Sequence, residues 1–378
     1  MRERPDVLFS LTGDVRRNSR AIRQLDALLD LGLKIEALTF GPEAEACWRG
    51  IRLHVLPRPT GSGPTFFAAV HRLFRKAALG ISARMYHASD LFTLPAMCAA
   101  AHAHRGRLLY DARELYPHVG ATAGKPWARL FWFLVERHYI SRANAVFTVS
   151  ESIAQRLSEM YGIPRPTLVY NAPDLQHIPR TSILRDRFGI TSDLAIILYQ
   201  GYLKRGRGCE LLLDAMRDIE RAVLVFMGEG DLEARLRAAA QHDSLAGKVF
   251  FADMALPDDL LPITASADIG ACLIEDLSLS LRYALPNKLF EYLMAGVPVL
   301  GSDLPEIRRV IETFDTGRVV HASDRTMLVE TLQGMVDDVH ARLRWSTNTR
   351  SVFQEYGWAQ SAQRFKAVYE RQLNCTSP

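Results

Sequence analysis

Residues 283–301 read Tyr-Ala-Leu-Pro-Asn-Lys-Leu-Phe-Glu-Tyr-Leu-Met-Ala-Gly-Val-Pro-Val-Leu-Gly. Pro286 and Gly296 bracket a short helical run, because proline is favoured at the start of a helix and glycine just after its end. The apolar run Pro298–Gly301 that follows is typical of a buried strand. The stretch therefore predicts a helix that leads directly into a strand, which is the repeating unit of a parallel α/β sheet.

The same predicted helix carries groups that suit a sugar nucleotide. Its N-terminus offers unpaired amides and the positive end of the helix dipole, and both favour a phosphate. Lys288 adds a cation in the first turn, where a positive charge opposes the dipole unless an anion is also bound. Glu291 lies one turn further on, where its carboxylate can accept two hydrogen bonds from neighbouring hydroxyls. The helix alone leaves open the alternative of a simple connecting helix with a solvated Glu291.

Short apolar runs alternate with helical stretches along almost the whole chain. In the first half the apolar runs are Val7–Leu11, Lys34–Phe40, Leu108–Tyr110, Ala145–Val149 and Thr167–Tyr170. In the second half they are Ala195–Gln200, Val223–Met227, Val249–Ala252, Ile269–Leu273 and Pro298–Gly301. The intervening helical stretches include Asn18–Leu31, Trp127–Arg142 and Ser152–Met160. This alternation predicts an α/β fold with two doubly wound parallel sheets, divided near residues 174–192.

The composition is that of an ordinary globular chain that is long enough for two domains. Of the 378 residues 48% are hydrophobic and 23% charged, and 46 basic residues oppose 42 acidic ones. This small excess of basic residues does not indicate a nucleic-acid-binding surface. It suits the binding of anionic small molecules or of an acidic membrane surface. Neither a signal peptide nor a membrane span is visible, so we expect a cytoplasmic protein.

The cysteines do not predict a metal site. They are Cys47, Cys98, Cys209, Cys272 and Cys375. They are scattered, form no CxxC pair and have no histidine at metal-ligand spacing, which favours a reducing compartment and no metal.

Ligands of open parallel sheets bind beyond the carboxyl ends of the strands, and successive strand ends of the second half carry suitable residues. The glycine-rich loop that begins at Gly201 supplies cations for a diphosphate at Lys204, Arg205 and Arg207. The next strand ends at Gly228, Glu229 and Gly230, which can approach a nucleotide edge, and the third ends at Asp253 and Met254. The fourth strand end is the loop of residues 275–287, which leads into the helix with Lys288 and Glu291. One such loop is usually a solvated turn, but four at neighbouring strand ends favour a nucleotide site.

The first half has its own candidates at strand ends. The loop after the first strand contains Gly13, Asp14 and Arg16, and later strand ends carry His87, Asp90, Asp111, Arg113 and Glu114. Asp111 and Glu114 have the chemistry of an acid/base pair or of hydroxyl-binding groups. An ion-pair network centred on Arg113 is the structural alternative.

Several motifs, in order along most of the chain, resemble those of the family-4 glycosyltransferases with the GT-B fold. They are Ala145–Ser150 with Ser152–Leu157, Val169–Asp174, Tyr199–Gly208, Ser266–Gly270, Leu285–Pro298 and Tyr356–Trp358. The stretch Leu285–Pro298 looks like the bacterial glycan branch with the P-N-K-L-F-E-Y motif. Their ordered coincidence is specific for the family.

The resemblance implies an architecture of two Rossmann-like domains with a cleft between them. Residues 1–178 would bind the acceptor, residues 179–357 would bind the nucleotide sugar, and residues 358–378 would form a helix that crosses back to the first domain. It also implies transfer of a sugar from a nucleoside-diphosphate sugar, UDP- or GDP-linked, to a hydroxyl acceptor, with retention and without a metal or another cofactor.

Residue roles follow from the resemblance at matching positions. Glu291 would hold the ribose hydroxyls, Lys204 and Arg207 would contact the diphosphate, and the backbone near Met254 would meet the base. The amides around Asn287, Lys288 and Leu289 would complete the diphosphate site. The positive groups would then be the main catalysts, because they stabilise the leaving diphosphate.

Two departures from the family pattern affect these roles. Many relatives have two glutamates eight positions apart, and the earlier position here is Tyr283. Tyr283 or backbone amides would have to replace that first glutamate in positioning the donor sugar. Relatives often show Asp-x-His-Glu where this chain has Asp111-Ala112-Arg113-Glu114, so Arg113 suggests an anionic group on the acceptor.

Acceptors of such enzymes are often lipid-linked, and residues 65–85 predict a basic amphipathic helix with Phe66, Leu73 and Phe74 on one face. Docking on the inner face of the cell membrane through this helix competes with packing of its apolar stripe on its own domain. The aromatic residues of Lys125–Arg142 are expected in the core.

Two other functions remain open at this stage. One is a catalytically inactive partner subunit that binds a nucleotide, which the missing glutamate at Tyr283 favours and the Lys288/Glu291 helix opposes. The other is a sugar-nucleotide 2-epimerase, which would need paired carboxylates and a histidine near the diphosphate. The named loops of the second half contain no such histidine.

Overall fold

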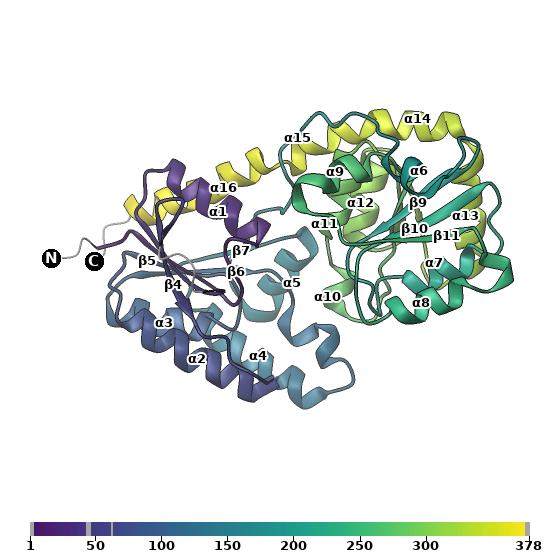
Figure 1. Cartoon of the computed structure of the whole chain (residues 1–378). Helices are drawn as coiled ribbons and strands as arrows, with labels where there is room; N and C mark the ends of the chain where they lie inside the picture. The colour runs from purple at the N-terminus through teal and green to yellow at the C-terminus, as the bar shows by residue number, and fades with distance from the viewer. Residues whose placement is uncertain (1–3, 43–46, 62, 375–378) are drawn as a thin grey trace. The chain divides into compact units, whose positions relative to one another are not determined.

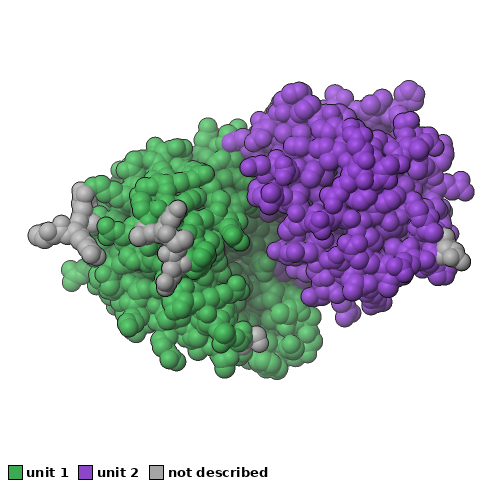
Figure 2. All heavy atoms as spheres, in the orientation of Figure 1, with its two compact units in different colours: residues 1–171, 358–378 green, residues 172–357 purple. Residues whose placement is uncertain are grey.

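The computed structural model describes residues 4–42, 47–61 and 63–374. The chain forms two compact units: unit 1 contains residues 1–171 and 358–378, and unit 2 contains residues 172–357 (Figure 2). The chain passes from unit 1 to unit 2 between residues 171 and 172, slightly before the domain boundary expected after residue 178.

Unit 1 is built on an eight-stranded sheet with the order β3-β4-β2-β1-β5-β6-β7-β8. The strands are β1 (Val7–Leu11), β2 (Ile35–Phe40), β3 (Cys47–Trp48), β4 (Ile51–Leu56), β5 (Met85–Ala88), β6 (Arg107–Ala112), β7 (Ala145–Thr148) and β8 (Thr167–Leu168). All neighbours pair in parallel except the edge strand β3, which runs antiparallel to β4. Strands β1 and β5 lie at the point where the chain reverses its direction across the sheet.

Helices cover both faces of this sheet (Figure 1). They are α1 (Ser19–Asp30), α2 (Gly63–Leu79), α3 (Leu94–Ala103), α4 (Pro126–Ile140), α5 (Glu151–Tyr161) and α16 (Trp358–Asn374). Helix α16 comes from the end of the chain, and Phe365, Val368 and Tyr369 on it share a core cluster with α1 residues such as Leu25 and Leu28. Helix α2 packs with α3 on the other face.

Unit 2 is built on a six-stranded parallel sheet with the order β11-β10-β9-β12-β13-β14. The strands are β9 (Ala195–Gln200), β10 (Ala222–Met227), β11 (Val249–Ala252), β12 (Ile269–Cys272), β13 (Val299–Ser302) and β14 (Gly317–Val320). The chain moves outward from β9 to β11 and then returns to the other side of β9 with β12. The space beyond β9 and β12 is therefore the topological switch point of unit 2, where such sheets bind ligands.

The helices of unit 2 connect its strands and close the unit. They are α6 (Ile183–Phe188), α7 (Cys209–Ala215), α8 (Glu233–Ala240), α9 (Pro257–Thr264), α10 (Leu279–Arg282), α11 (Asn287–Met294), α12 (Pro305–Thr313), α13 (Arg325–Asp337), α14 (Val339–Asn348) and α15 (Val352–Tyr356). Side chains of α7, α8 and α13 contribute to one core cluster with β9 and β10. Helix α11 packs against α9 and β12.

The predicted fold class, two doubly wound parallel sheets, is confirmed. Four strands were missing from the predicted apolar runs: Cys47–Trp48, Ile51–Leu56, Met85–Ala88 and Gly317–Val320. Each is short or contains polar residues, so none forms the continuous apolar run used to find strands. The expectation that the aromatic residues of α4 are core is wrong for Trp127, whose exposed fraction is 65%.

Candidate active site

Helix α11 begins at the carboxyl edge of the unit 2 sheet and forms as the sequence predicts. Pro286 is its N-cap residue, with an extended backbone (φ −77°, ψ 145°), rather than its first helical residue. The buried side chains of Leu289, Phe290 and Leu293 fix one face of the helix on the sheet. Gly296 then adopts φ 71°, a left-handed conformation that favours glycine and ends the helix.

Glu291 on α11 is held by the last residue of β9. The Gln200 Nε2 amide donates a hydrogen bond of 2.6 Å to Glu291 Oε2. Gln200 Oε1 in turn accepts a hydrogen bond of 2.9 Å from the hydroxyl of Thr264, at the end of α9. Gln200 and Thr264 are 2% and 0% exposed, so water does not compete for these bonds. The Glu291 carboxylate is therefore fixed at the switch point.

Lys288 turns its ammonium group into the protein. Nζ lies 3.6 Å from the centroid of the Tyr199 ring, on β9, and forms no hydrogen bond with any described residue. Burial lowers the pKa of Lys288 to about 8, and the nearby Arg207 guanidinium acts in the same direction. A buried ammonium with a ring face beside it but no hydrogen-bond acceptor is costly. An anion at the start of α11 would relieve that cost.

The glycines at the strand ends bring backbone segments together. A Cβ atom on Gly228 (φ 151°) would lie 2.0 Å from the carbonyl oxygen of Gly201, and one on Gly230 (φ 154°) would lie 2.4 Å from that of Leu203. The Leu203 amide donates to the Glu229 carbonyl at 2.8 Å. The Gly228–Gly230 loop therefore packs against the Gly201–Leu203 loop, and this contact explains its glycines without a nucleotide.

The other predicted donor residues lie at the same sheet edge with different exposure. Lys204, Glu229 and Asn287 are exposed, Arg207 and Tyr283 are partly buried, and Met254, after β11, is 40% exposed. Leu289 is fully buried, and its amide already donates to the carbonyl of Pro286 at 3.1 Å. Of the three α11 amides expected at a diphosphate, that of Leu289 is therefore engaged within the helix turn.

Asp111, at the carboxyl end of β6, is the centre of a buried ion-pair network. Its carboxylate accepts from Arg20 Nε (2.7 Å) and Nη2 (2.6 Å), Gln24 Nε2 (3.0 Å) and Arg113 Nε (3.2 Å). Burial alone would raise the pKa of Asp111, but Arg20 above all, and also Arg113, lower it well below the usual range. A fully buried, permanently ionised carboxylate suits a structural counter-ion. This geometry therefore opposes the acid/base role expected for Asp111.

His87, on β5, lies inside unit 1 rather than on an acceptor surface. Its ring is fully buried, stacks on Phe9 with centroids 4.6 Å apart, and places Nδ1 2.7 Å from the Tyr369 hydroxyl on α16. Burial lowers the pKa of His87 to about 3, so the imidazole is neutral at physiological pH. The expectation of an acceptor contact from His87 is not supported by this placement.

Asp90 joins the two loops at the switch point of unit 1. Its carboxylate accepts from the Thr12 amide (3.0 Å) and hydroxyl (2.6 Å), and from the Thr93 amide (2.9 Å) near the start of α3. Because Asp90 is only 6% exposed, these bonds give it a structural role.

The remaining predicted residues of unit 1 lie nearer the surface. Asp14 pairs with Arg16 at 2.8 Å in the loop that follows Gly13, and Glu114 is exposed. Arg113 keeps one buried nitrogen, Nη2, without a hydrogen-bond partner among the described residues. Arg113 is therefore the best placed of these groups to receive an anion.

Sequence reasoning gave no role to Gln200, Thr264, Tyr199 or Tyr292; the hydroxyl of Tyr292 accepts a hydrogen bond from the backbone N–H of Gln200 at 3.0 Å. Gln200 had a usable signal, since it is a polar residue that ends an apolar strand directly before a glycine. The other three required the packing of α9 and α11 on the sheet. Among residues 4–42, 47–61 and 63–374, no group of three or more His, Cys, Asp or Glu side chains is placed to hold a metal ion.

Two family models match the chain, one on each half. Residues 18–173 match the glycosyl transferase 4-like domain, and residues 181–352 match the glycosyl transferases group 1 family. A curated relative, the phosphatidyl-myo-inositol mannosyltransferase of Mycobacterium leprae, is 27% identical over 183 residues, 46% of either chain. The chain thus aligns with only about half the length of curated relatives such as this one.

Two solved structures have the same fold over the full chain. Sucrose-phosphate synthase from Thermosynechococcus elongatus is 17% identical with a TM-score of 0.84, over 99% of this chain and 100% of that one. HepE of Anabaena, solved in complex with UDP and glucose, is 14% identical with a TM-score of 0.76, over 98% and 100%. The two halves of the chain thus match two glycosyltransferase family models, and the whole chain has the fold of these two solved structures.

Proposed function

We propose that the protein transfers a sugar from a nucleoside-diphosphate sugar to a hydroxyl acceptor, as a retaining and metal-independent enzyme of the bacterial glycan branch with the P-N-K-L-F-E-Y motif. The observation that carries this proposal is the buried ammonium of Lys288, which has no acceptor of its own at the start of α11. One turn further on, Glu291 is held as a fixed hydrogen-bond acceptor. An anion site next to a fixed carboxylate suits a diphosphate joined to a ribose.

The chemistry follows from the cations at the sheet edge. Breaking the bond between the anomeric carbon and the diphosphate oxygen leaves negative charge on the diphosphate. Lys288 and Arg207, with Lys204 at the rim, would stabilise that charge. The departing diphosphate oxygen would take the proton of the acceptor hydroxyl as the new glycosidic bond forms on the same face of the sugar. No protein carboxylate is required as a base in this scheme.

The donor in this proposal is a UDP- or GDP-linked sugar, with UDP tested first. HepE, which shares the fold, was solved with UDP and glucose, and this likeness supports UDP. The acceptor would bind to unit 1, where Arg113 offers a buried nitrogen for an anionic group. Glu114 and the Asp14–Arg16 loop would contact its hydroxyls.

A lipid-linked acceptor would bring the enzyme to a membrane, and we propose that α2 and α4 provide the contact. On α4, the apolar residues Trp127, Leu130 and Leu134 follow helical spacing on one face and are 65%, 57% and 54% exposed. Helix α2 contacts the middle of α4 through Phe67 and Trp132, whose ring centroids lie 5.0 Å apart. An apolar stripe beside a cationic helix is typical of an interfacial membrane contact.

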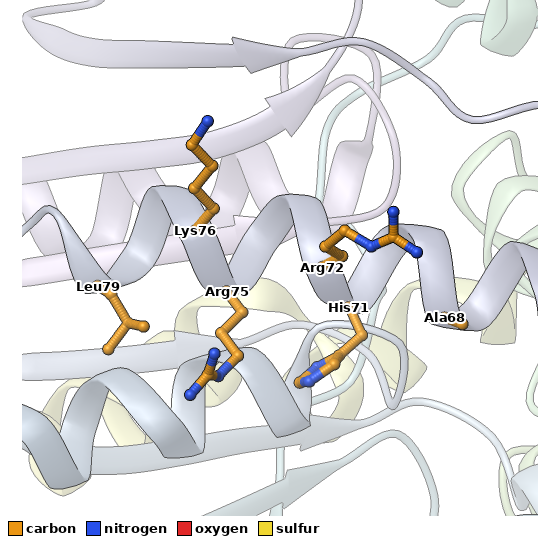
Figure 3. A pocket seen from close by; sticks show the side chains of 6 residues that line it. All are labelled: Ala68, His71, Arg72, Arg75, Lys76 and Leu79. Carbon is orange, nitrogen blue, oxygen red and sulfur yellow. The ribbon is translucent and has the colours of Figure 1, made fainter.

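Helix α2 carries the charge. An open pocket of about 570 Å³ along it is lined by Ala68, His71, Arg72, Arg75, Lys76 and Leu79 (Figure 3). In Figure 3 His71 and Arg75 point to one side of α2 and Lys76 to the other. No acidic residue occurs on α2, and the single one on α4, Glu136, is buried. No helix among the described residues has the length and hydropathy needed to cross a bilayer.

Vesicle binding tests the proposed membrane contact. The full chain should sediment with vesicles that contain anionic lipid and much less with purely zwitterionic ones, because each cation near the surface adds about 1 kcal/mol. Trp127→Gln with Leu130→Gln should release it, while the control Leu343→Gln, which changes a 61% exposed leucine of unit 2, should not. Equal binding by both variants, or none by the wild-type chain, would remove α4 from the proposal.

Turnover and binding assays separate the candidate functions. The transferase should bind one nucleoside diphosphate and, with a suitable hydroxyl acceptor, release it with formation of a glycoside. Glu291→Gln and Lys288→Met should weaken both binding and turnover. The control is Arg221→Met, at an exposed arginine directly before β10, at the opposite end of the sheet from the site. Conversion of a sugar nucleotide into its isomer without an acceptor would favour the epimerase. Binding without any turnover across acceptors would favour the inactive subunit.

A further inference from the structure

We propose that Gln200 positions Glu291 for recognition of the nucleotide ribose, and that Thr264 holds Gln200 in the orientation this requires. The inference rests on the proposed function, since it takes Glu291 as the group that binds the ribose hydroxyls. It assigns a role to two buried residues that do not themselves contact the ligand.

The contact between Gln200 and Glu291 is short and shielded from water. Gln200 Nε2 donates to Glu291 Oε2 at 2.6 Å, and Gln200 is 2% exposed. A hydrogen bond to an ionised acceptor is roughly twice as strong as one between neutral groups, and exclusion of water strengthens it further. Gln200 can therefore hold the carboxylate in one rotamer.

The orientation of the Gln200 amide follows from its two neighbours. An ionised carboxylate can only accept, so the amide must turn its NH2 group toward Glu291 and its carbonyl away. The carbonyl then lies 2.9 Å from the Thr264 hydroxyl, which has to donate its single proton to it. The Leu260 carbonyl oxygen lies 2.7 Å from the same hydroxyl, so the two acceptors share this proton in a three-centre hydrogen bond. The result is a directional chain from hydroxyl to amide to carboxylate.

The surrounding backbone leaves little freedom for any other arrangement. The hydroxyl of Tyr292, next to Glu291, accepts from the backbone N–H of Gln200 at 3.0 Å and donates to the Leu198 carbonyl at 2.9 Å. Its ring occupies the space above Gly270, where a Cβ atom would lie 2.4 Å from the ring. Helix α11 is thus locked to β9 in one register. Because the helix backbone is fixed, Glu291 can move only by changing its side-chain rotamer. The hydrogen bond from Gln200 restricts that change.

Nucleotide analogues provide the test. The nucleoside diphosphate that binds the wild-type chain most tightly, chosen from UDP, GDP, ADP and dTDP, is titrated calorimetrically beside its 2′,3′-dideoxy analogue. The ratio of the two dissociation constants measures recognition of the ring hydroxyls. It is determined for the full chain and for Gln200→Leu, Thr264→Val and Glu291→Gln. Thr316→Val, an equally buried threonine of unit 2 outside this chain of bonds, is the control.

We expect Gln200→Leu to lower this ratio on the order of tenfold, the effect of one lost hydrogen bond to a charged group, as Glu291→Gln should also do. Affinity for the dideoxy analogue should change little. Thr264→Val should give a smaller loss and Thr316→Val none. The double variant Gln200→Leu, Glu291→Gln should be no worse than Glu291→Gln alone, since both remove the same interaction.

A conservative variant adds a readout that a merely structural role would not produce. Gln200→Glu places a second carboxylate beside Glu291, and the two would share a proton. Ribonucleotide affinity should then fall as the pH rises, although wild-type discrimination between the two analogues stays constant over the same range.

Three results would overturn the proposal in distinguishable ways. If Gln200→Leu weakens both analogues equally, or neither, Gln200 does not position Glu291, while the proposed function stands. If the wild-type chain binds both analogues equally, Glu291 is not the ribose acceptor. If it binds none of the four diphosphates, the proposed function falls and this inference falls with it. Folding of each variant is verified by its thermal unfolding before the titrations are compared.

Discussion

The buried ammonium of Lys288 makes ligand binding depend on pH at the scale of a single residue. Its pKa of about 8 in the free protein means that the charged fraction falls as the pH rises through 8. A bound diphosphate favours the charged form, so affinity should be constant well below pH 8 and weaken steadily up to pH 9.5. Calorimetric titration of the nucleoside diphosphate at pH 6.5, 8 and 9.5 measures this. Lys288→Met should bind about tenfold more weakly at pH 6.5 and show no such pH dependence.

A second residue, Glu136 on α4, links pH to the stability of unit 1. It accepts hydrogen bonds of 2.7 Å from Tyr110 and Tyr161, and burial raises its pKa from 4.5 to about 7. The folded state therefore holds this proton more tightly than the unfolded state. The free energy of unfolding should fall by about 3 kcal/mol at most as the pH rises from 4.5 to 7. Above pH 7 it should level off.

Glu136→Gln should remove that slope and stabilise the chain at pH 8, because a neutral amide can keep both tyrosine hydroxyls bonded. Urea unfolding at pH 5 and pH 8 measures it, with the exposed Glu159→Gln as control. Equal pH dependence in Glu136→Gln and the wild-type chain would contradict the assignment.

At the scale of elements, the loops at the carboxyl ends of β9 and β10 depend on the absence of side chains. A methyl group on Gly228 would lie 2.0 Å from the Gly201 carbonyl oxygen, and that atom belongs to backbone that cannot turn aside. Gly228→Ala should therefore separate the two loops, lower the unfolding temperature, and weaken nucleotide binding by displacing Gly201.

The matched control is Gly334→Ala, in the middle of α13, where an added Cβ meets nothing within 4 Å. It should raise stability by about 0.5–1 kcal/mol, because alanine is the better helix former. Thermal unfolding of the two variants should thus move in opposite directions. A Gly228→Ala protein as stable as the wild type would show that the loops are not packed as described.

At the scale of the whole molecule, the C-terminal helix α16 is part of the core of unit 1. Phe365, Val368 and Tyr369 are at most 3% exposed, and the Tyr369 hydroxyl bonds to His87, far away in sequence. Removal of residues 358–378 should destabilise unit 1 while leaving the sheet of unit 2 intact. Calorimetry with saturating nucleoside diphosphate distinguishes the units, because the ligand stabilises only the unit that binds it.

In the truncated chain, the ligand-sensitive transition should keep its temperature and the other should move down or disappear. Loss of the ligand-sensitive transition alone would mean that α16 supports unit 2 instead. The substitution Tyr369→Phe is a milder change than the truncation, because it leaves α16 in place and removes only the hydrogen bond between the Tyr369 hydroxyl and His87.

Much of this architecture could be derived from the sequence. The apolar runs Ala195–Gln200 and Val249–Ala252 are strands with those very bounds. The first is the fully buried strand β9, and a parallel strand buried on both faces has to be largely apolar. Proline and glycine at positions 286 and 296 delimit α11 within a residue, since backbone geometry restricts both. Because the helix that they delimit follows a predicted strand, the same residues also placed Lys288 and Glu291 near the carboxyl edge of the sheet.

Other features were decided by tertiary structure alone. Whether Asp111 is a catalytic group or a counter-ion depended on Arg20, and whether Glu291 is fixed depended on Gln200, both distant in sequence. His87 is neutral because it is buried, in part against Tyr369 of α16, and Trp127 is 65% exposed although it is aromatic. Local patterns report the conformation that each segment favours, whereas the charge, exposure and partners of a side chain depend on which distant segments pack around it.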